Sequence, residues 1–247
     1  MEIRALLGQP LSGRHTLPGD FVPLTPDIGR VHAAYARISS LGRSADLHRV
    51  APSAAHLPAA TRLVCNVDMD HIATVVVESG EALCTGGLST CVLLAAKGAD
   101  PQGRTVIGLL HQSSDFSAGD GVTTMRAAMA LRGVHHYRTV VLGGELSRDA
   151  AGGGSIRDAI AIAEAAHNEG TLACGLIGVT QMSPEDVADM ERPADVLPAA
   201  PGVPYKLCVV VTGDGIYYAE QGEHGPTLFD EEAVPEDATP MAELLQG

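Results

Sequence analysis

The alternation of apolar and polar positions along the chain predicts a series of short β-strands separated by a few helices. Runs rich in β-branched residues end at Asn, Asp or Gly, which is typical of strands bounded by turns. Strands are expected at Arg62–Val67, Ile72–Glu78, Cys91–Ala96, Thr105–His111, Tyr137–Leu142, Thr171–Val179, Lys206–Thr212 and Ile216–Glu220. The order of these elements decides which kind of sheet they form.

Helices are expected where the apolar spacing changes to a helical period. They are predicted at Ile28–Leu41, from Asp120 or Thr123 to Arg132, from Ile156 to Asn168, and briefly after Pro184. Ser155 is the expected N-cap of the third helix and Gly170 closes it. Because strands and helices alternate without a strict strand–helix–strand rhythm, an α/β (α+β) fold with mixed sheets is favoured over a purely parallel one.

The pattern divides the chain into three parts. Residues 1–62 are rich in Pro, Gly, Ser and His and predict an irregular N-terminal extension with one helix. Residues 63–230 carry the regular pattern of the predicted catalytic domain, interrupted by a surface loop at Glu191–Pro204 that holds four prolines. Residues 231–247 form an acidic tail that we expect to be solvated.

Composition narrows the class of protein. Apolar residues make up 45 % of the 247 residues, but aromatic residues only 3 %, so an aliphatic core is expected. The net charge of −14 argues against nucleic acid and against an anionic membrane surface as partners. The five cysteines do not form a disulfide pattern and indicate reduced thiols in a cytoplasm. No signal peptide or apolar 18-residue stretch is visible, although a protein exported without a cleaved signal would look the same.

A predicted hairpin brings a thiol towards an imidazole. Cys91 and His111 each lie ten positions from Pro101 in the turn-forming segment between two strands. Directly opposed residues of an antiparallel pair share a face, so an unbulged hairpin centred on Pro101 places the two side chains together. A one-residue bulge would turn one of them to the other face.

This pair has the chemistry of an activated cysteine. An imidazole can take the thiol proton, and the thiolate is the nucleophile. Gly86 and Gly87 let the backbone turn closely before the cysteine, and Thr85 can hydrogen-bond the imidazole and fix its orientation. The competing interpretation is that Cys91 is a small buried apolar residue and His111 an ordinary strand-end residue.

The segment resembles a known enzyme family. Thr85, five intervening residues, Cys91 in Leu88-Ser89-Thr90-Cys91, and a histidine at the end of the next strand are similar to the chemoreceptor glutamine deamidases of the CheD type. They are also similar to the catalytic domain of cytotoxic necrotizing factor and to Burkholderia lethal factor. The resemblance covers roughly residues 65–180; a Ser or Thr stands where the family has glycine beside the cysteine.

The resemblance implies a fold and a reaction. The fold is layered, with two packed mixed sheets and outer helices. The catalytic residues would be Cys91, His111 and Thr85, with the oxyanion held by backbone N–H groups at Ser89 and Thr90. Residues expected to line the site are Gly86, Gly87, Leu88 and Gln112. The reaction converts a glutamine side chain of a partner protein to glutamate through a thioester, without a metal or organic cofactor.

Several functions remain open at this level. Within the deamidase class, the long N-terminal extension favours a bacterial effector or toxin that acts on a host protein. The strand ending in Gly143-Gly144 favours a housekeeping chemoreceptor-type deamidase. Outside that class, the same residues fit a Cys–His peptidase or amidase on small molecules, or a catalytically inactive interaction module with an acidic surface.

Four further groups of residues carry weaker signals. Asp68, Asp70 and His71 could ligate a metal, but their spacing suits a solvated turn; the adjacent His135 and His136 would point to opposite faces of a strand. A Gly152–Gly154 loop before Ser155 could bind phosphate at a helix N-terminus. Structural roles, rather than a zinc site, are expected for the remaining cysteines, Cys65, Cys84, Cys174 and Cys208.

Overall fold

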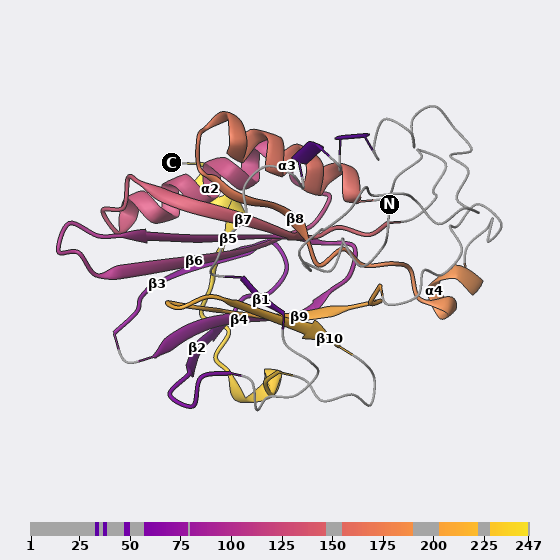
Figure 1. The fold of residues 1–247 in the computed structure, drawn as a ribbon, viewed down its shortest axis with the longest axis horizontal. Helices are drawn as coiled ribbons and strands as arrows, with labels where there is room; N and C mark the ends of the chain where they lie inside the picture. Colours follow the sequence, from indigo (N-terminus) through magenta and orange to yellow (C-terminus); the bar gives the residue numbers. More distant parts are fainter. Residues whose placement is uncertain are drawn as a thin grey trace.

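Two mixed β-sheets pack face to face, with helices on the outer side of one of them (Figure 1). The structure is a computed structural model that describes residues 33–34, 37–38, 47–49, 57–78, 80–146, 155–189, 203–221 and 228–246. This arrangement confirms the predicted layered α/β fold class. The Gly152–Gly154 loop, most of residues 1–62 and most of Glu191–Pro204 lie outside the described residues.

The first sheet, called sheet A, is formed by five strands in the order β1-β10-β9-β4-β2. Their bounds are Leu47–Arg49 (β1), Arg62–Asn66 (β2), Glu81–Leu88 (β4), Leu207–Thr212 (β9) and Ile216–Glu220 (β10). The pairs β1–β10 and β2–β4 are parallel and the others antiparallel. The sequence pattern predicts β2, β9 and β10 in part or in full, but not β1 or β4.

The second sheet, called sheet B, contains six strands in the order β11-β3-β6-β5-β7-β8. Their bounds are His71–Val76 (β3), Val92–Ala99 (β5), Thr105–Gln112 (β6), Tyr137–Gly143 (β7), Leu172–Ile177 (β8) and Thr239–Pro240 (β11). Only β7–β8 is a parallel pair. All the strands that the sequence predicts between residues 72 and 179 belong to this sheet.

The longer helices cover the outer face of sheet B (Figure 1). They are α2 (Ala118–Leu131) and α3 (Ile156–Asn168); two short helices are α4 (Pro184–Ala188) and α5 (Met241–Leu245). Helix α2 begins before the expected Asp120 or Thr123, because Ser117 caps it. The Ser117 side chain accepts from the Asp120 N–H, and the Asp120 carboxylate accepts from the Ser117 N–H, which is a capping box.

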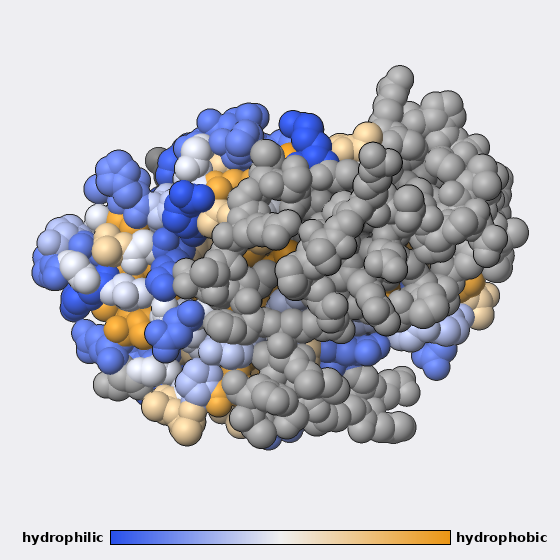
Figure 2. Space-filling view, viewed as in Figure 1, coloured by the Kyte–Doolittle hydropathy of each residue, from blue (hydrophilic) through white to orange (hydrophobic). Residues whose placement is uncertain are grey.

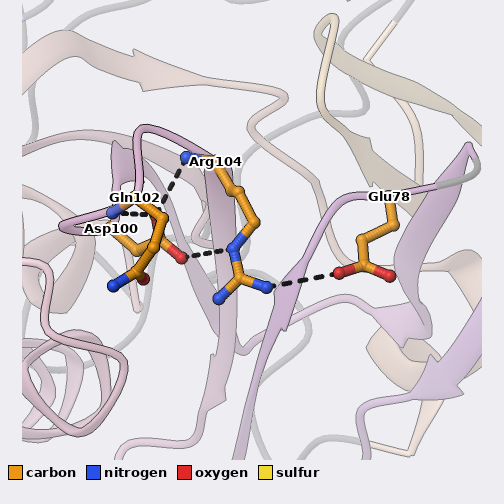
Figure 3. Close-up of polar contacts among 4 residues, drawn as sticks. All are labelled: Glu78, Asp100, Gln102 and Arg104. Carbon is orange, nitrogen blue, oxygen red and sulfur yellow. Dashed lines mark hydrogen bonds and ion pairs between the residues drawn. The ribbon is translucent and has the colours of Figure 1, made fainter.

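The β5–β6 turn is fixed by one carboxylate (Figure 3). Asp100 Oδ1 accepts from the N–H groups of Gln102 and Arg104, both at 2.9 Å, and Oδ2 accepts from Arg104 Nε at 2.7 Å. Arg104 also forms an ion pair with Glu78 at 3.3 Å. Burial alone would raise the pKa of Asp100, but the hydrogen bonds and charge of Arg104 outweigh it and the pKa is lowered. The turn therefore has one well-defined centre.

That centre is Gln102, not Pro101, and this corrects the predicted register. Ala99 pairs with Thr105, and His111 pairs with Leu93 rather than with Cys91. Cys91 is two residues further along, diagonally across from His111. Because the displacement is two residues, the two positions still share one face of the sheet.

Apolar layers on both faces of sheet B position the strands that carry the site residues. Between the sheets, Leu93 and Leu109 of sheet B meet Val209 and Tyr218 of sheet A, all at most 1 % exposed. Between sheet B and the helices, Leu110 meets Met125 of α2. Odd-numbered residues of β5 and β6 therefore face sheet A and even-numbered residues face the helices, which fixes the direction of every site residue on these strands.

The expectation of a solvated C-terminal tail is wrong for part of its described residues, and described residues of the N-terminal extension also pack against the two sheets. Ile38 is fully buried against the helix side of sheet B, and β1 pairs with β10. At the other end, β11 pairs with β3, and Met241 at the start of α5 is fully buried. The average composition of these two segments is polar, but the apolar residues within them make buried contacts that the average does not reveal.

The described part of the surface is largely hydrophilic in the view of Figure 2, with small apolar areas between polar side chains. Large apolar side chains that stay exposed include Met69 at 50 % and Leu131 at 77 %. Across the described ranges, no helix has the length and apolarity needed to cross a membrane.

Candidate active site

The three residues singled out by the sequence come from both sheets. Thr85 lies on β4 of sheet A, His111 lies on β6 of sheet B, and Cys91 directly precedes β5. All three are buried, with exposures of 1 %, 4 % and 8 %, respectively. The predicted contact between Thr85 and the imidazole is therefore a contact between the two layers, at the interface of the sandwich.

The hydrogen bonds of Thr85 determine which nitrogen of His111 carries the proton. Thr85 Oγ1 lies 2.7 Å from the Val67 carbonyl oxygen and 2.8 Å from His111 Nδ1. A carbonyl oxygen can only accept, so the single hydroxyl proton of Thr85 is donated to Val67. His111 Nδ1 must then donate its N–H to Thr85 Oγ1, and the neutral imidazole has its lone pair on Nε2.

The Nε2 atom of His111 is buried and has no hydrogen-bond partner among the described residues. A buried nitrogen without a partner costs free energy, so such an atom suggests a role with a ligand or a reacting group. Cys91 lies diagonally across from His111 on the same sheet face, where neighbours are about 7–8 Å apart. The thiol and the imidazole therefore share a site without a direct hydrogen bond.

The thiol of Cys91 is neutral at rest. Burial raises its pKa most strongly, a hydrogen bond with the Thr90 side chain lowers it, and the charges of Asp70 and Asp68 raise it further, with a net increase. A thiolate held by an imidazolium is thus not the resting state. Any reaction at Cys91 requires a base that removes the proton during attack.

The imidazole of His111 is neutral as well. Burial lowers its pKa; the nearby Val67 carbonyl and the charges of Asp68 and Asp70 raise it, but the net direction is downward. A neutral imidazole with a free Nε2 is the form that can accept a proton near neutral pH.

Asp68 and Asp70 belong to a hydrogen-bonded turn between β2 and β3. The Asp70 carboxylate accepts from Ser113 N at 2.7 Å and from Ser113 Oγ at 2.9 Å, and its backbone has a φ of 61°. Asp68 Oδ1 accepts from Met69 N at 2.7 Å. His71 Nδ1 lies 2.8 Å from the Met69 carbonyl. These side chains stabilise the turn, which places two negative charges beside the site.

The segment before Cys91 is held by groups that lie far away in the sequence. Thr180 Oγ1 donates to the Ser89 carbonyl at 2.5 Å, and Gly144 N donates to the Cys91 carbonyl at 3.2 Å. The reverse bond of an antiparallel pair, from Cys91 N–H to Gly144, is not formed, and within the described chain the Cys91 N–H donates to no other backbone carbonyl. It is therefore a candidate oxyanion donor.

The two glycines after Thr85 form a bulge in β4, where the pairing with β9 shifts. Gly87 has a φ of 66°, and its N–H donates to Gln221 Oε1 at 2.6 Å. Gln221 Nε2 in turn donates to Glu231 Oε1 at 2.7 Å, and this carboxylate occupies the space that a Cβ at Gly86 would need. Gln221 and Glu231 thus hold the backbone beside Thr85, a role that no sequence spacing indicates.

The remaining predicted site residues are placed as follows. Ser89 is half-buried and Thr90 is exposed in the bend before Cys91, and Leu88 is fully buried in the layer between the sheets. Gln112 corrects the expectation that it lines the site. Its Nε2 donates to the carbonyls of Phe116 and Ser117 at 2.9 and 3.1 Å, on the helix side of sheet B. Adjacent strand residues face opposite sides, so Gln112 points away from the face of His111.

The weaker sequence signals do not form sites among the described residues. No group of three or more His, Cys, Asp or Glu side chains there has an arrangement that could hold a metal ion. His135 and His136 lie in the loop before β7 and are exposed, not on a strand as expected. All five cysteines are buried, and none of them forms a disulfide. Burial raises the pKa of Cys65 and Cys208, as it does for Cys84.

The lowered pKa of His111 makes the free energy of unfolding depend on pH. The unfolded chain binds a proton near the ordinary value of 6.5, whereas the folded chain does so only at lower pH. The stabilisation from this group is therefore fully present above pH 6.5, and it is lost as the pH falls towards the pKa of His111 in the folded protein. Urea denaturation of wild type and His111→Asn should show a smaller loss of stability in the variant between about pH 7.5 and 5.5; equal losses would contradict the assignment.

No protein-family model matches the chain, and no curated protein matches it.

Proposed function

We propose that the protein is a cysteine-dependent deamidase that converts a glutamine side chain of a partner protein to glutamate. The observation that carries this proposal is the hydrogen-bond chain from His111 Nδ1 through Thr85 to Val67. This chain leaves the basic Nε2 free on the same sheet face as a buried thiol. A cysteine with an oriented base beside it suits acyl transfer.

The neutral resting state defines the first step. As the Cys91 sulfur attacks the carboxamide carbon of glutamine, His111 Nε2 takes the thiol proton. The resulting imidazolium donates that proton to the leaving nitrogen, the C–N bond breaks, and ammonia departs from a thioester. The absence of a Cys91–His111 hydrogen bond at rest is compatible with this step, because catalytic hydrogen bonds often form or tighten only when substrate is bound.

Water completes the reaction at the same base. His111 Nε2 removes a proton from water, the oxygen attacks the thioester carbon, and the C–S bond breaks. The proton returns to the Cys91 sulfur, and the product is a glutamate side chain. The candidate donor to the negatively charged oxygen formed in both halves is the Cys91 N–H, which belongs to the residue whose carbonyl the Gly144 N–H holds.

The charge around the site favours a class of substrate. Asp68 and Asp70 lie close enough to affect the pKa of both Cys91 and His111, and the whole chain carries −14. A partner surface that is basic or neutral around its target glutamine would meet less repulsion than an acidic one. Deamidation then adds one negative charge to that surface, which would weaken the complex and favour product release.

The proposal is tested with the wild type, Cys91→Ser and Cys174→Ser, the last being a matched change of another buried thiol. Each is incubated with bacterial and animal-cell lysates, and ammonia release and glutamine-to-glutamate mass shifts are measured. We expect shifts at defined glutamines with the wild type and Cys174→Ser but not with Cys91→Ser. The lysate that contains the substrate separates a chemoreceptor-type role from an effector role. New peptide termini without such shifts would indicate a peptidase instead, and the absence of any Cys91-dependent shift would contradict the proposal.

A further inference from the structure

Asp70, in the turn before β3, is hydrogen-bonded to three separate parts of the fold. Its N–H donates to the His111 carbonyl of β6 at 2.6 Å, and its own carbonyl accepts from the Met241 N–H of α5 at 2.9 Å. Its carboxylate accepts from the backbone N–H and the hydroxyl of Ser113, at 2.7 and 2.9 Å. Asp70 therefore joins the C-terminal part of the chain to the strand that carries the candidate base.

The backbone conformation of Asp70 explains how it reaches both neighbours of β3. In a regular antiparallel strand, the N–H and the C=O of one residue point to the same neighbouring strand. Strand β3 lies between β11 and β6, and Asp70 directs its N–H to β6 but its C=O to the start of α5, which follows β11. Its φ of 61° makes it the only non-glycine residue with a positive φ among the described residues. Aspartate adopts this left-handed region more readily than most residues.

The contacts of Asp70 hold the backbone of β6 at His111 and directly after it. The N–H of Asp70 holds the carbonyl of His111 itself, and the carboxylate holds Ser113, two residues further on. Thr85 fixes the Nδ1 side of the imidazole, so the position of Nε2 depends on where the His111 backbone lies. A displacement of about 1 Å in a catalytic group can cost about 10²-fold in rate. The activity is therefore expected to depend on Asp70.

The C-terminal segment Thr239–Leu245 supports Asp70 from the other side. Strand β11 pairs with the first two residues of β3, and the side chain of Met241 is fully buried in the apolar layer between sheet B and the helices. The Met241 N–H then donates to the Asp70 carbonyl. This segment is thus anchored on both sides of the contact through which it reaches the candidate active site.

We propose that Asp70 is a positioning residue for His111, and that the C-terminal segment Thr239–Leu245 acts on His111 through Asp70. The inference rests on the proposed function, because that function makes His111 the base. Asp70 acts through the backbone of β6 and not in proton transfer, since Ser113 donates to both of its carboxylate oxygens.

The pH dependence of the rate separates the position of His111 from the charge of Asp70. Among the described residues, the charges of Asp68 and Asp70 raise the pKa of His111. Removing one of these charges lowers this pKa, so the acidic limb of the rate, which requires neutral His111, moves to lower pH. The other titratable side chain on this face is Cys91, whose pKa is raised above 9.0 and lies outside that limb.

Two variants of Asp70 remove the same charge but differ in geometry. Asparagine keeps an oxygen for the Ser113 N–H and tolerates the left-handed conformation, whereas alanine does neither. Both variants should move the acidic limb to lower pH by the same amount. At the plateau above this limb, we expect Asp70→Asn to keep kcat within about threefold of the wild type and Asp70→Ala to lose about tenfold or more. Asp70→Gly, which accepts a φ of 61° but lacks the carboxylate, replaces the alanine variant if that one does not fold.

Asp120→Ala is the matched control for the loss of a carboxylate brace. The Asp120 carboxylate accepts from the N–H and the hydroxyl of Ser117, at 2.9 and 2.7 Å, but at the start of α2. This variant should lose stability and keep the plateau value of kcat. The proposal would be overturned by a plateau in Asp70→Ala that equals the wild-type value, or by a loss in Asp70→Asn as large as that in Asp70→Ala.

Hydrogen exchange at His111 provides a readout that needs no deamidation. The Nδ1–H of His111 is bonded to Thr85 in a buried site, so its NMR signal should exchange slowly in the wild type, Asp70→Asn and Asp120→Ala. Exchange should be faster in Asp70→Ala. This pattern in a protein without deamidase activity would support the positioning role and contradict the proposed function alone. An unchanged exchange rate in Asp70→Ala would contradict the positioning role, whatever the activity.

Met241→Pro and Met241→Ala test the part of the C-terminal segment. Both variants lose the buried side chain, but only proline lacks the N–H that donates to Asp70. Proline suits the first position of a helix, and Pro240 has φ −57° and ψ 136°, which a residue before proline prefers. We expect the plateau kcat of Met241→Pro to be about threefold or more below that of Met241→Ala, with faster exchange at His111 Nδ1. Equal kcat and equal exchange in the two variants would overturn the role of this segment.

Discussion

Replacing His111 with asparagine is expected to slow the Cys91-dependent conversion of glutamine to glutamate by about 10²–10⁴-fold. Asparagine keeps an N–H donor near Thr85 Oγ1 and the Val67 carbonyl, but it has no atom that can act as the base Nε2. The resting thiol is neutral because burial raises its pKa, so the variant lacks the group that must remove its proton. The large effect follows from this neutral resting state.

The measurement uses the substrate identified with the wild type and follows glutamate formation by mass spectrometry. Alkylation of Cys91 by iodoacetamide at the same pH provides a readout that needs no substrate, and it should also slow. His167→Asn is the matched control, because His167 is exposed in the last turn of α3. A variant at position 111 that reacts within tenfold of the wild type, on a folded protein, would exclude His111 as the base.

The juxtaposition of Cys91 and His111 could be predicted from the sequence although the register could not. Two apolar runs around turn residues predict a hairpin. When the centre of a hairpin moves by one residue, every cross-strand partner moves by two residues and stays on the same face of the sheet. Moving its centre from Pro101 to Gln102 shifts the partner of His111 by two residues, from Cys91 to Leu93, and a shift of two does not change the face. The actual centre depends on Asp100 and its bonds to Arg104, a tertiary detail of the turn.

The element that carries Thr85 was beyond the sequence pattern. Residues 81–88 contain two adjacent glycines, which predict a turn, but the chain continues through them as β4 with a bulge. Burial between β2 and β9 supplies the pairing that low strand propensity does not. The predicted Thr85–His111 hydrogen bond is confirmed, but its geometry, from one sheet to the other, depends on how the two layers pack.

The supporting contacts could not be found by spacing at all. Thr180, Gln221 and Glu231 follow Cys91 by about 90 to 140 residues, and they act on the backbone directly or through one another. Hydrogen bonds to backbone atoms leave no residue-type signature at the partner position. Gln112 shows the opposite error: proximity in sequence to His111 suggested the site, but strand alternation turns its side chain to the helices.

Gly143→Ala should cost more stability than a glycine-to-alanine change in an open turn, and it should disrupt the backbone at Cys91. Gly143 has a φ of 84°, which costs an alanine about 1–2 kcal/mol. A Cβ there would also lie 2.8 Å from the Cys91 carbonyl oxygen and 3.0 Å from Leu88 Cδ2. Overpacking of this kind costs about 1–3 kcal/mol more, because backbone and core atoms must move.

Gly103→Ala separates these two costs. Gly103 has a φ of 79° in the β5–β6 turn, but a Cβ there meets no atom within 4 Å. Urea denaturation should therefore show only the conformational loss of unfolding free energy for Gly103→Ala and an additional loss for Gly143→Ala. The dependence of this free energy on urea concentration should stay the same in both variants. The deamidation rate should fall only in Gly143→Ala, because displacement of the Cys91 carbonyl also moves the N–H and the thiol of Cys91. Equal stability losses in the two variants would mean that β7 moves to accommodate the added methyl group. If the deamidation rate of Gly143→Ala were also unchanged, close packing of Gly143 against the Cys91 carbonyl would not be what holds the nucleophile in place.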